Sequence, residues 1–297
     1  MSASIEVQDL TLKYGPVTAV DGLTFSLEAG RIHGLLGRNG SGKTSLLSVV
    51  SAFRKATSGV ALVDGEPVWE NPRATRKICF IRGSGDTVAG DWPSDKVSDA
   101  LALAADHRPE WDTNFATKLT DRFELDPKAH IGKLSQGQRS ALGVILGLAS
   151  RCPVTIFDES YLGMDAPSRY TFYEELLADY LAHPRTILLS THLIEEVSNL
   201  FDEVVIIDRG RLLLHDNVDD LRSRGASVTG PADSVDRFAE GLTVLSSRQL
   251  GPTRSVTTYG ELDEGRLRQA REAGLEIGPI TLQDLFVHLT EAERIPV

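Results

Sequence analysis

The sequence predicts an α/β protein built on a parallel sheet, and two observations lead to this prediction. A glycine-rich stretch, residues 37–44, lies between an apolar run and a segment that reads as a helix. Two further apolar runs, residues 154–157 and 187–190, are separated by an amphipathic stretch around residues 170–180. Alternation of strand and helix is typical of a parallel sheet with crossover helices.

The elements around the glycine-rich stretch read as strands. Residues 5–36 show strand-like alternation of apolar and polar side chains. Asp64-Gly65, after the apolar residues 60–63, is a hairpin signal. Residues 78–81 are short and apolar, as expected of a buried strand.

The segment from about Ser84 to Ala149 changes to helical periodicity. Residues 204–207 and 211–214, on either side of Asp208-Arg209-Gly210, predict a closing hairpin. From about Gly225 the pattern weakens, and the chain finishes on a helical stretch behind a possible Thr281 cap.

The glycine-rich stretch has the spacing of a phosphate-binding loop. It reads Gly37-Arg38-Asn39-Gly40-Ser41-Gly42-Lys43-Thr44. Glycines let the backbone bring successive N–H groups to phosphate oxygens, and the following helix adds the positive end of its dipole. Lys43 would supply a cation to the β- and γ-phosphates, and the Thr44 hydroxyl would be a ligand for Mg²⁺. We therefore expect a bound nucleoside triphosphate; the alternative is a glycine-rich turn that binds nothing.

The composition excludes several classes of protein. Hydrophobic residues make up 41% and charged residues 25% of the 297, as in an ordinary globular protein. The net charge of −11 argues against nucleic-acid binding, because that requires Lys and Arg to neutralise phosphates. Cys79 and Cys152 are isolated in apolar surroundings, so we expect packed thiols without a disulfide framework or a metal site. No signal peptide and no apolar run of ~18 residues is present, so any membrane association requires a partner.

Two carboxylates follow the apolar residues 154–157. A buried strand presents its last residues at the carboxyl edge of the sheet, beside the phosphate loop. Asp158 is placed there to hold Mg²⁺ through water, and Glu159 to orient or deprotonate the water that attacks the γ-phosphate. The alternative from these residues alone is an acidic strand end that caps the next turn.

A capping box marks another helix start. In Leu134-Ser135-Gln136-Gly137-Gln138, Ser135 precedes an apolar helical stretch and Gln138 follows it by three residues. One interpretation is a well-capped core helix. The other is a second anion site made by Ser135, Gly137 and the free N–H groups of the first turn.

Together these motifs resemble the nucleotide-binding subunit of an ABC transporter. The phosphate loop, the stretch at 134–138, the strand ending in Asp158-Glu159 and Leu189-Ser190-Thr191-His192 occur in that family's order. The likeness covers residues 4–220 and extends in particular to bacterial export-type ATPases that are encoded separately from their membrane partner.

The resemblance implies a domain organisation. Residues 1–224 would be the ABC ATP-binding domain, with a P-loop NTPase (RecA-like) parallel-sheet core, an antiparallel β subdomain and a helical subdomain at about 84–149. Residues 225–297 would form a small C-terminal accessory domain, which either adds packing or senses a ligand.

The resemblance also implies residue roles. Tyr14 would stack on adenine, unless it is an ordinary strand-end aromatic. His192 would contact the γ-phosphate and help orient the attacking water, and Asp165 would lie in the loop that crosses to the other subunit. The stretch Ser135, Gln136, Gly137 and Gln138 would serve the ATP of the opposite protomer, so that two copies sandwich two ATP molecules about a two-fold axis.

The implied partners follow from this arrangement. An integral membrane permease would hold the protein at the cytoplasmic face of the cell membrane, where ATP and Mg²⁺ drive export of an unknown substrate. A homodimer is expected in preference to a heterodimer, and no nucleic acid is expected.

The chain departs from the family pattern at the position after residues 78–81. The family normally has a glutamine there that contacts Mg²⁺, but this chain has none between Gln8 and Gln136. The equivalent position falls near Gly83, and Ser84 or Asp86 would be the substitute oxygen ligand.

Two smaller departures leave the catalytic groups in place. Gln136 stands where the family more often has glycine, and Ser160 where proline is usual. We expect hydrolysis to survive these changes and coupling to be altered.

Two functions of different classes remain open from the sequence. The first is an export ATPase subunit. The second is a nucleotide-gated regulatory ATPase with weak or uncoupled hydrolysis, which the missing glutamine supports. A chromosome-maintenance ATPase would need a long heptad-rich insertion before Ser135, and a translation-factor relative would need two phosphate loops. Neither feature is present.

Overall fold

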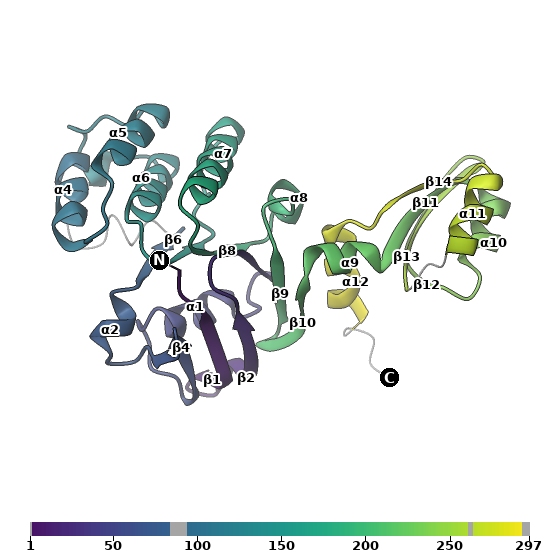
Figure 1. Ribbon diagram of the computed structural model, residues 1–297, viewed down its shortest axis with the longest axis horizontal. Helices are drawn as coiled ribbons and strands as arrows, with labels where there is room; N and C mark the ends of the chain where they lie inside the picture. Colours follow the sequence, from purple (N-terminus) through teal and green to yellow (C-terminus); the bar gives the residue numbers. More distant parts are fainter. Residues whose placement is uncertain (1, 84–93, 261–263, 293–297) are drawn as a thin grey trace. The chain divides into compact units, whose positions relative to one another are not determined.

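The computed structural model describes residues 2–83, 94–260 and 264–292. Within these ranges no helix is both long and apolar enough to cross a membrane. The chain divides into two compact units, Met1–His192 with Ile207–Leu212, and Leu193–Ile206 with Leu213–Val297. The strands of the described ranges form three sheets (Figure 1).

The first sheet is antiparallel, with the strand order β2-β1-β4-β5. Its strands confirm the alternation seen in the sequence, because the buried side chains of β1 and β2 are the apolar ones. The predicted hairpin is also confirmed: Val63 pairs with Glu66, and Asp64 and Gly65 have φ values of 57° and 74°. The strands are β1 Ile5–Tyr14, β2 Val17–Leu27, β4 Ser58–Val63 and β5 Glu66–Pro67.

The second sheet contains the predicted parallel core, with the strand order β10-β9-β3-β8-β7-β6. The pairs β3–β8, β7–β8 and β6–β7 all run parallel. Every residue of β3, β7 and β8 is buried, as expected of strands that are covered on both faces. The strands are β3 Ile32–Leu36, β6 Ile78–Arg82, β7 Val154–Asp158 and β8 Thr186–Thr191.

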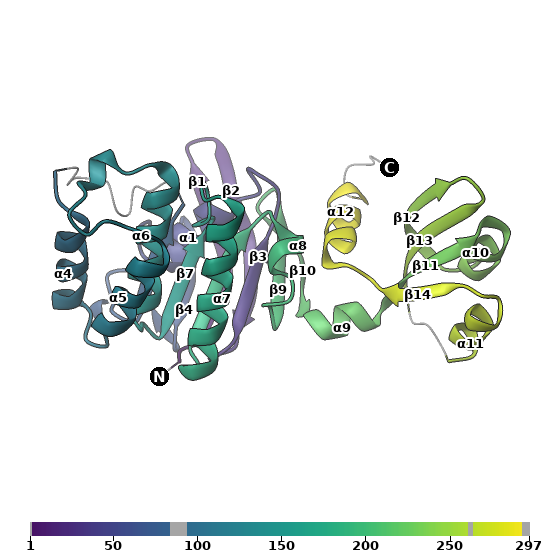
Figure 2. The same ribbon diagram turned by 90° about the horizontal axis from the view of Figure 1, so that it is seen from above.

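Crossover helices connect the parallel strands. Helix α1, Lys43–Val50, follows β3, and helix α7, Ala166–Ala182, joins β7 to β8. Phe172 of α7 packs edge-on against Phe157 of β7, with ring centroids 5.2 Å apart. Helix α7 therefore covers the sheet (Figure 2).

The described part of the predicted helical segment forms α4, α5 and α6, which lie side by side in both views (Figures 1 and 2). Asp112 caps α5 by accepting a hydrogen bond from the backbone N–H of Phe115 at 2.8 Å. The bounds are α2 Pro72–Thr75, α4 Val97–His107, α5 Thr113–Arg122, a 3₁₀ turn at Ile131–Lys133, and α6 Gln136–Ala149.

The predicted closing hairpin is formed by β9, Glu203–Asp208, and β10, Arg211–Asn217, which are neighbours in the sheet. Arg209 and Gly210 both have positive φ, 47° and 80°, as the tight hairpin turn requires. The N–H of Gly210 donates to the carbonyl oxygen of Ser41 at 2.8 Å, so this turn supports the phosphate loop.

The C-terminal residues form a βαββαβ unit, the order of a ferredoxin-like motif. Its antiparallel sheet has the order β12-β13-β11-β14. Helices α10 and α11 pack on one face, where their residues Val235, Phe238 and Ala270 join Val228 and Val256 in one core. The elements are β11 Gly225–Pro231, α10 Ala232–Ala239, β12 Thr243–Leu250, β13 Thr253–Tyr259, α11 Glu264–Glu272 and β14 Glu276–Pro279.

Three short or terminal helices complete the second unit. The last of them begins where the sequence predicted, because the Thr281 hydroxyl accepts a hydrogen bond from the N–H of Asp284 at 3.0 Å. The helices are α8 Ile194–Val197, α9 Val218–Ser223 and α12 Leu282–Ala292. The domain boundary at residue 225 stays a prediction; β11 begins there.

The two cysteines are free and buried, as expected. Although they are isolated from each other in the sequence, the fold brings them close enough for each to shift the pKa of the other thiol, so that the pKa of Cys152 is lowered and that of Cys79 is raised. The guanidinium of Arg108 also donates to Cys152 Sγ at 3.3 Å. Cys79 lies on β6 and Cys152 precedes β7, and pairing of these two strands brings the thiols together.

Candidate functional site

The phosphate loop lies at the carboxyl end of β3, and its path requires glycine. Gly40 and Gly42 have φ values of 80° and 107°, which other residues rarely adopt. A Cβ on Gly37 would lie 2.3 Å from Ser41 Oγ, and one on Gly42 would lie 2.4 Å from the carbonyl oxygen of Ala19. Backbone conformation or close packing therefore requires glycine at each of the three positions 37, 40 and 42.

Helix α1 begins directly after the loop. Gly42 is its N-cap, and no side chain of the described residues caps it. The first-turn N–H groups of a helix have no intrahelical partner. Ser41 Oγ is buried and likewise has no hydrogen-bond partner in the described part of the chain. The loop therefore offers N–H donors and a helix dipole together, the arrangement that binds phosphate.

Lys43 is buried at the base of the loop. Its Nζ donates to the carbonyl oxygens of Gly37 at 2.7 Å and Arg38 at 3.2 Å. The same ammonium lies 3.5 Å from Oε1 of Glu159. The loop cation is thus adjacent to the carboxylate that the sequence predicts to be catalytic.

Thr44 and Asp158, the predicted metal ligands, lie side by side. The Thr44 hydroxyl lies close enough to the Asp158 carboxylate to affect its pKa. Burial raises the pKa of Asp158, and the nearby Thr44 hydroxyl opposes that rise. Oδ1 of Asp158 is buried without a hydrogen-bond partner among the described residues. A buried carboxylate oxygen beside a hydroxyl fits Mg²⁺, which prefers oxygen ligands.

Glu159 and His192 contact each other where β7 and β8 end. Nδ1 of His192 lies 3.3 Å from Oε1 of Glu159. The N–H of Glu159 donates to the carbonyl oxygen of Ser190 at 3.0 Å, and Glu159 has a φ of 50°. A non-glycine residue at this φ is uncommon, and such backbone strain persists where the surrounding structure enforces it. The structure therefore groups Glu159, His192 and Lys43.

Tyr161 belongs to the same group, although no motif in the sequence assigns it a role. Its hydroxyl lies 3.1 Å from Nδ1 of His192 and accepts from Thr191 Oγ1 at 3.0 Å. The backbone N–H of His192 also donates to this hydroxyl, at 3.3 Å. The only signal in the sequence is a tyrosine two residues after Glu159, and that spacing does not reveal its partner.

The predicted capping box at the start of α6 is confirmed. Ser135 Oγ accepts from the N–H of Gln138 at 3.2 Å, and Gln138 Oε1 accepts from the N–H of Ser135 at 2.9 Å. A Cβ on Gly137 would lie 2.5 Å from the carbonyl oxygen of Gly163. The start of α6 therefore packs closely on the loop at 160–165, while Ser135 itself is exposed.

Tyr14 and Asp165 lie at the margins of this region. The Tyr14 hydroxyl donates to Ser45 Oγ of α1 at 3.4 Å, and the guanidinium of Arg54 lies 4.9 Å from the Tyr14 ring centroid. Asp165 is exposed and caps α7 by accepting from the N–H of Ser168 at 2.9 Å. Hydrogen bonds from Ser168 lower the pKa of Asp165. The roles of Tyr14 and Asp165 toward ATP stay predictions.

At Gly83 and Ser160, two of the positions that depart from the family pattern, the structure shows why the residue present fits. A Cβ on Gly83 would lie 2.0 Å from the carbonyl oxygen of Glu159, so this backbone leaves no room for a side chain. Ser160 Oγ donates to the carbonyl oxygen of Ile81 at 3.0 Å, a bond that proline could not make. The proposed substitutes Ser84 and Asp86 lie outside the described residues.

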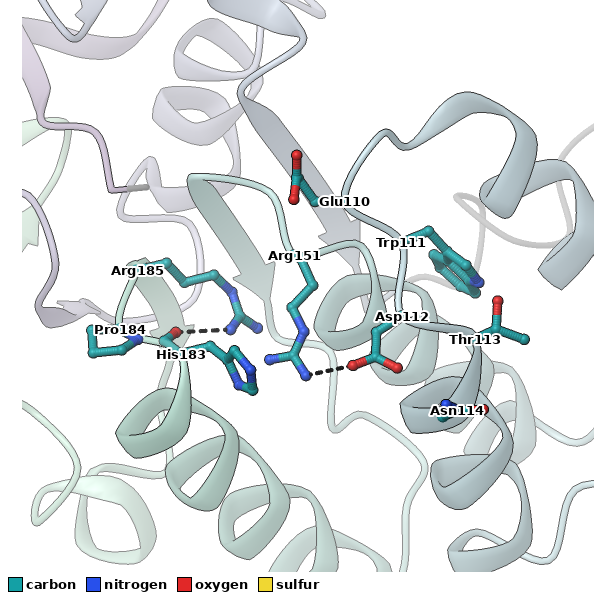
Figure 3. Close-up of a pocket in the computed structure, with 9 residues that line it drawn as sticks. All are labelled: Glu110, Trp111, Asp112, Thr113, Asn114, Arg151, His183, Pro184 and Arg185. Carbon is teal, nitrogen blue, oxygen red and sulfur yellow. Dashed lines mark hydrogen bonds and ion pairs between the residues drawn. The ribbon is translucent and has the colours of Figure 1, made fainter.

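A separate pocket of about 620 Å³ lies where β7 and β8 begin, at the opposite edge of the parallel sheet (Figure 3). Arg151 forms ion pairs with Asp112, at 2.9 Å, and with Asp179. Arg185 pairs with Asp179 at 2.7 Å. Because these charges neutralise one another while tying α5 and α7 to the sheet, the cluster is structural.

The parallel sheet, phosphate loop and carboxylate pair define a P-loop ATPase. The chain matches the family model described as ABC transporter over residues 20–161. It is 30% identical over 306 residues to the Nod factor export ATP-binding protein I of Ralstonia nicotianae, covering 97% of this chain and 94% of that protein. It is 28% identical over 312 residues to the daunorubicin resistance ATP-binding protein DrrA3 of Streptomyces coeruleorubidus, covering 98% of this chain and 97% of that protein. The chain therefore belongs to the family of ABC transporter ATP-binding proteins, which are ATPases.

Solved structures show the same fold. An ATP-binding subunit of an ABC transporter matches with a TM-score of 0.63 at 23% identity, covering 73% of this chain and 91% of that one. A dimeric ATP-binding cassette bound to ADP and phosphate matches with a TM-score of 0.62 at 17% identity, covering 72% of this chain and 98% of that one. The resemblance inferred from the sequence and the predicted fold class are thus confirmed.

Proposed function

We propose that this ATPase works as a head-to-tail dimer and powers export through a separate membrane permease. The observation that carries the proposal is the position of Glu159, whose carboxylate lies between the Lys43 ammonium and the His192 imidazole at the end of β7. Two relatives are named for Nod factor export and daunorubicin resistance, which supports export as the direction of transport.

The residues of the loop would hold the triphosphate. The backbone N–H groups of 37–44 bind its oxygens, and Lys43 exchanges its contacts with the loop carbonyls for the β- and γ-phosphates. Thr44 and Asp158 hold Mg²⁺, which when bound neutralises charge on the phosphates. Tyr14 stacks on the adenine.

Glu159 and His192 would act on the attacking water. The Glu159 carboxylate accepts a hydrogen bond from that water and orients it in line with the γ-phosphate. His192 contacts the γ-phosphate and supports the carboxylate, from which its Nδ1 is 3.3 Å distant. The φ of 50° at Glu159 shows that the backbone leaves the extended conformation of β7 at this residue.

The second protomer would complete the site. Exposed Ser135 and the first turn of α6 contribute donors to the nucleotide of the partner copy, and Asp165 lies in the loop that faces it. A related cassette assembles as a dimer with ADP and phosphate, which supports this arrangement. One chain carries the phosphate loop, the Asp158-Glu159 pair and the stretch at 134–138 that two equivalent sites require, so we propose a homodimer.

The permease would hold the dimer at the cytoplasmic face of the membrane. The net charge of −11 disfavours both nucleic acid and an anionic membrane surface as direct partners. The alternative of a regulatory ATPase without transport is less well supported, because one relative is named for export and the other for drug resistance.

The Glu159→Gln variant tests the proposal. Removing the carboxylate charge should lower the rate of ATP hydrolysis by on the order of 10²–10⁴-fold while ATP binding persists. ATP should then hold the variant as a dimer, measured by light scattering, whereas the exposed Glu195→Gln control should hydrolyse ATP like the wild type. Unchanged hydrolysis by Glu159→Gln rejects the role of Glu159, and a monomer with ATP bound rejects the dimer.

A further inference from the structure

Two departures from the family pattern contact each other in the structure. Nε2 of Gln136 donates to the carbonyl oxygen of Gly83 at 2.8 Å, across 53 residues of sequence. The N–H of Gly83 in turn donates to the carbonyl oxygen of Asp158 at 2.7 Å. Two hydrogen bonds in series therefore join the first residue of α6 to the strand end that carries Asp158 and Glu159.

Close packing fixes both ends of this connection. A Cβ on Gly163 would lie 2.5 Å from Cγ of Gln136, so the stem of this glutamine lies against the backbone of Gly163. A Cβ on Gly83 would lie 2.0 Å from the carbonyl oxygen of Glu159. Position 83 therefore has no room for an amide side chain, whereas a glycine at position 136 would have no group with which to reach Gly83.

We propose that Gln136 is a positioning residue, which fixes the backbone at Gly83 against the end of β7. The geometry of Glu159 therefore depends on the position of α6 in the same subunit. This inference rests on the proposed role of Glu159 in hydrolysis. A shift of α6 breaks the bond from Gln136 and releases the backbone that packs on the Glu159 carbonyl. Instead of carrying an amide side chain of its own, position 83 is thus held through its backbone by an amide from α6.

The first measurement is hydrogen–deuterium exchange of the full-length protein without nucleotide. In Gln136→Ala and Gln136→Glu, neither of which can donate to Gly83, exchange of the Gly83 amide should rise by about 2- to 10-fold, the range of one hydrogen bond. Gln249→Ala is the matched control, because Gln249 Nε2 also donates to a glycine carbonyl, that of Gly251, at 3.2 Å in the other unit. This control should leave exchange at Gly83 unchanged.

The second measurement is steady-state ATP hydrolysis. Both Gln136 variants should lower kcat by about 2- to 10-fold with little change in KM, because the phosphate loop that binds ATP does not depend on this bond. If Gln136 instead contacts only the nucleotide of the partner copy, both variants should raise KM, and exchange of the Gly83 amide should stay as in the wild type.

The outcomes separate the two proposals. Wild-type-like exchange at Gly83 in both variants overturns the connection, and faster exchange with unchanged kcat shows that the bond is only structural. Absence of hydrolysis in the wild type contradicts the proposed function, while the exchange measurement still reports on Gln136.

Discussion

Tyr161 connects three groups of the site, and its hydroxyl can be removed without removing its ring. In Tyr161→Phe, Nδ1 of His192, the Thr191 hydroxyl and the N–H of His192 each lose a partner at 3.0 to 3.3 Å. A single hydrogen bond contributes about 0.5–1.5 kcal/mol net, and loss of one partner of a buried polar group costs about 1–3 kcal/mol. We therefore expect the free energy of unfolding to fall by about 2 kcal/mol.

The same substitution should also slow hydrolysis. His192 is the group that Tyr161 holds beside Glu159, so looser orientation of the imidazole weakens its action on the attacking water. A loss of about 1.4 kcal/mol in the transition state corresponds to a tenfold fall in kcat. Steady-state ATPase kinetics and thermal unfolding of the same preparations measure the two effects.

Tyr180→Phe is the matched control. The Tyr180 hydroxyl donates to the carbonyl oxygen of Gly30 at 2.7 Å, before β3 begins and therefore at the other edge of the sheet. This variant should lose comparable stability and keep the wild-type kcat. The assigned link to His192 would be refuted if Tyr161→Phe had the kcat of the wild type, or if kcat fell equally in Tyr161→Phe and Tyr180→Phe.

Two further predictions concern Gly83, which follows β6, and Cys152, which precedes β7. Gly83→Ala should destabilise the protein by about 1–3 kcal/mol, because its Cβ meets the carbonyl oxygen of Glu159; a melting temperature equal to that of the wild type contradicts this packing. A hydrogen bond from Cys79, aided by the Arg108 guanidinium, lowers the pKa of the Cys152 thiol to about 6. This folded value lies below the unfolded value of about 8.5, so the stabilisation from Cys152 develops as pH rises from 6 to 8.5 and is lost as pH falls through 6. Above pH 8.5 the raised pKa of Cys79 opposes it. The melting temperatures of wild type and Cys152→Ser should therefore converge between pH 8.5 and pH 6, and a constant difference would reject a low thiol pKa.

The sequence by itself determined the local elements of this protein. The phosphate loop, the capping box at Ser135 and the turns at Asp64-Gly65 and Arg209-Gly210 depend on backbone sterics and on hydrogen bonds within a few residues. Buried apolar strands separated by a helical pattern also predicted the parallel core. These features are readable because their causes act over short stretches of chain.

Only the tertiary structure decided which distant side chains meet. Tyr161 and His192 are 31 residues apart, and Gln136 and Gly83 are 53 apart. The pairing of β6 with β7 brings Cys79 to Cys152, although each cysteine looked isolated in the sequence. A periodic pattern specifies the face that an element buries, but not the element it is buried against. That choice is made by the packing of the whole sheet, because non-local contacts depend on strand order.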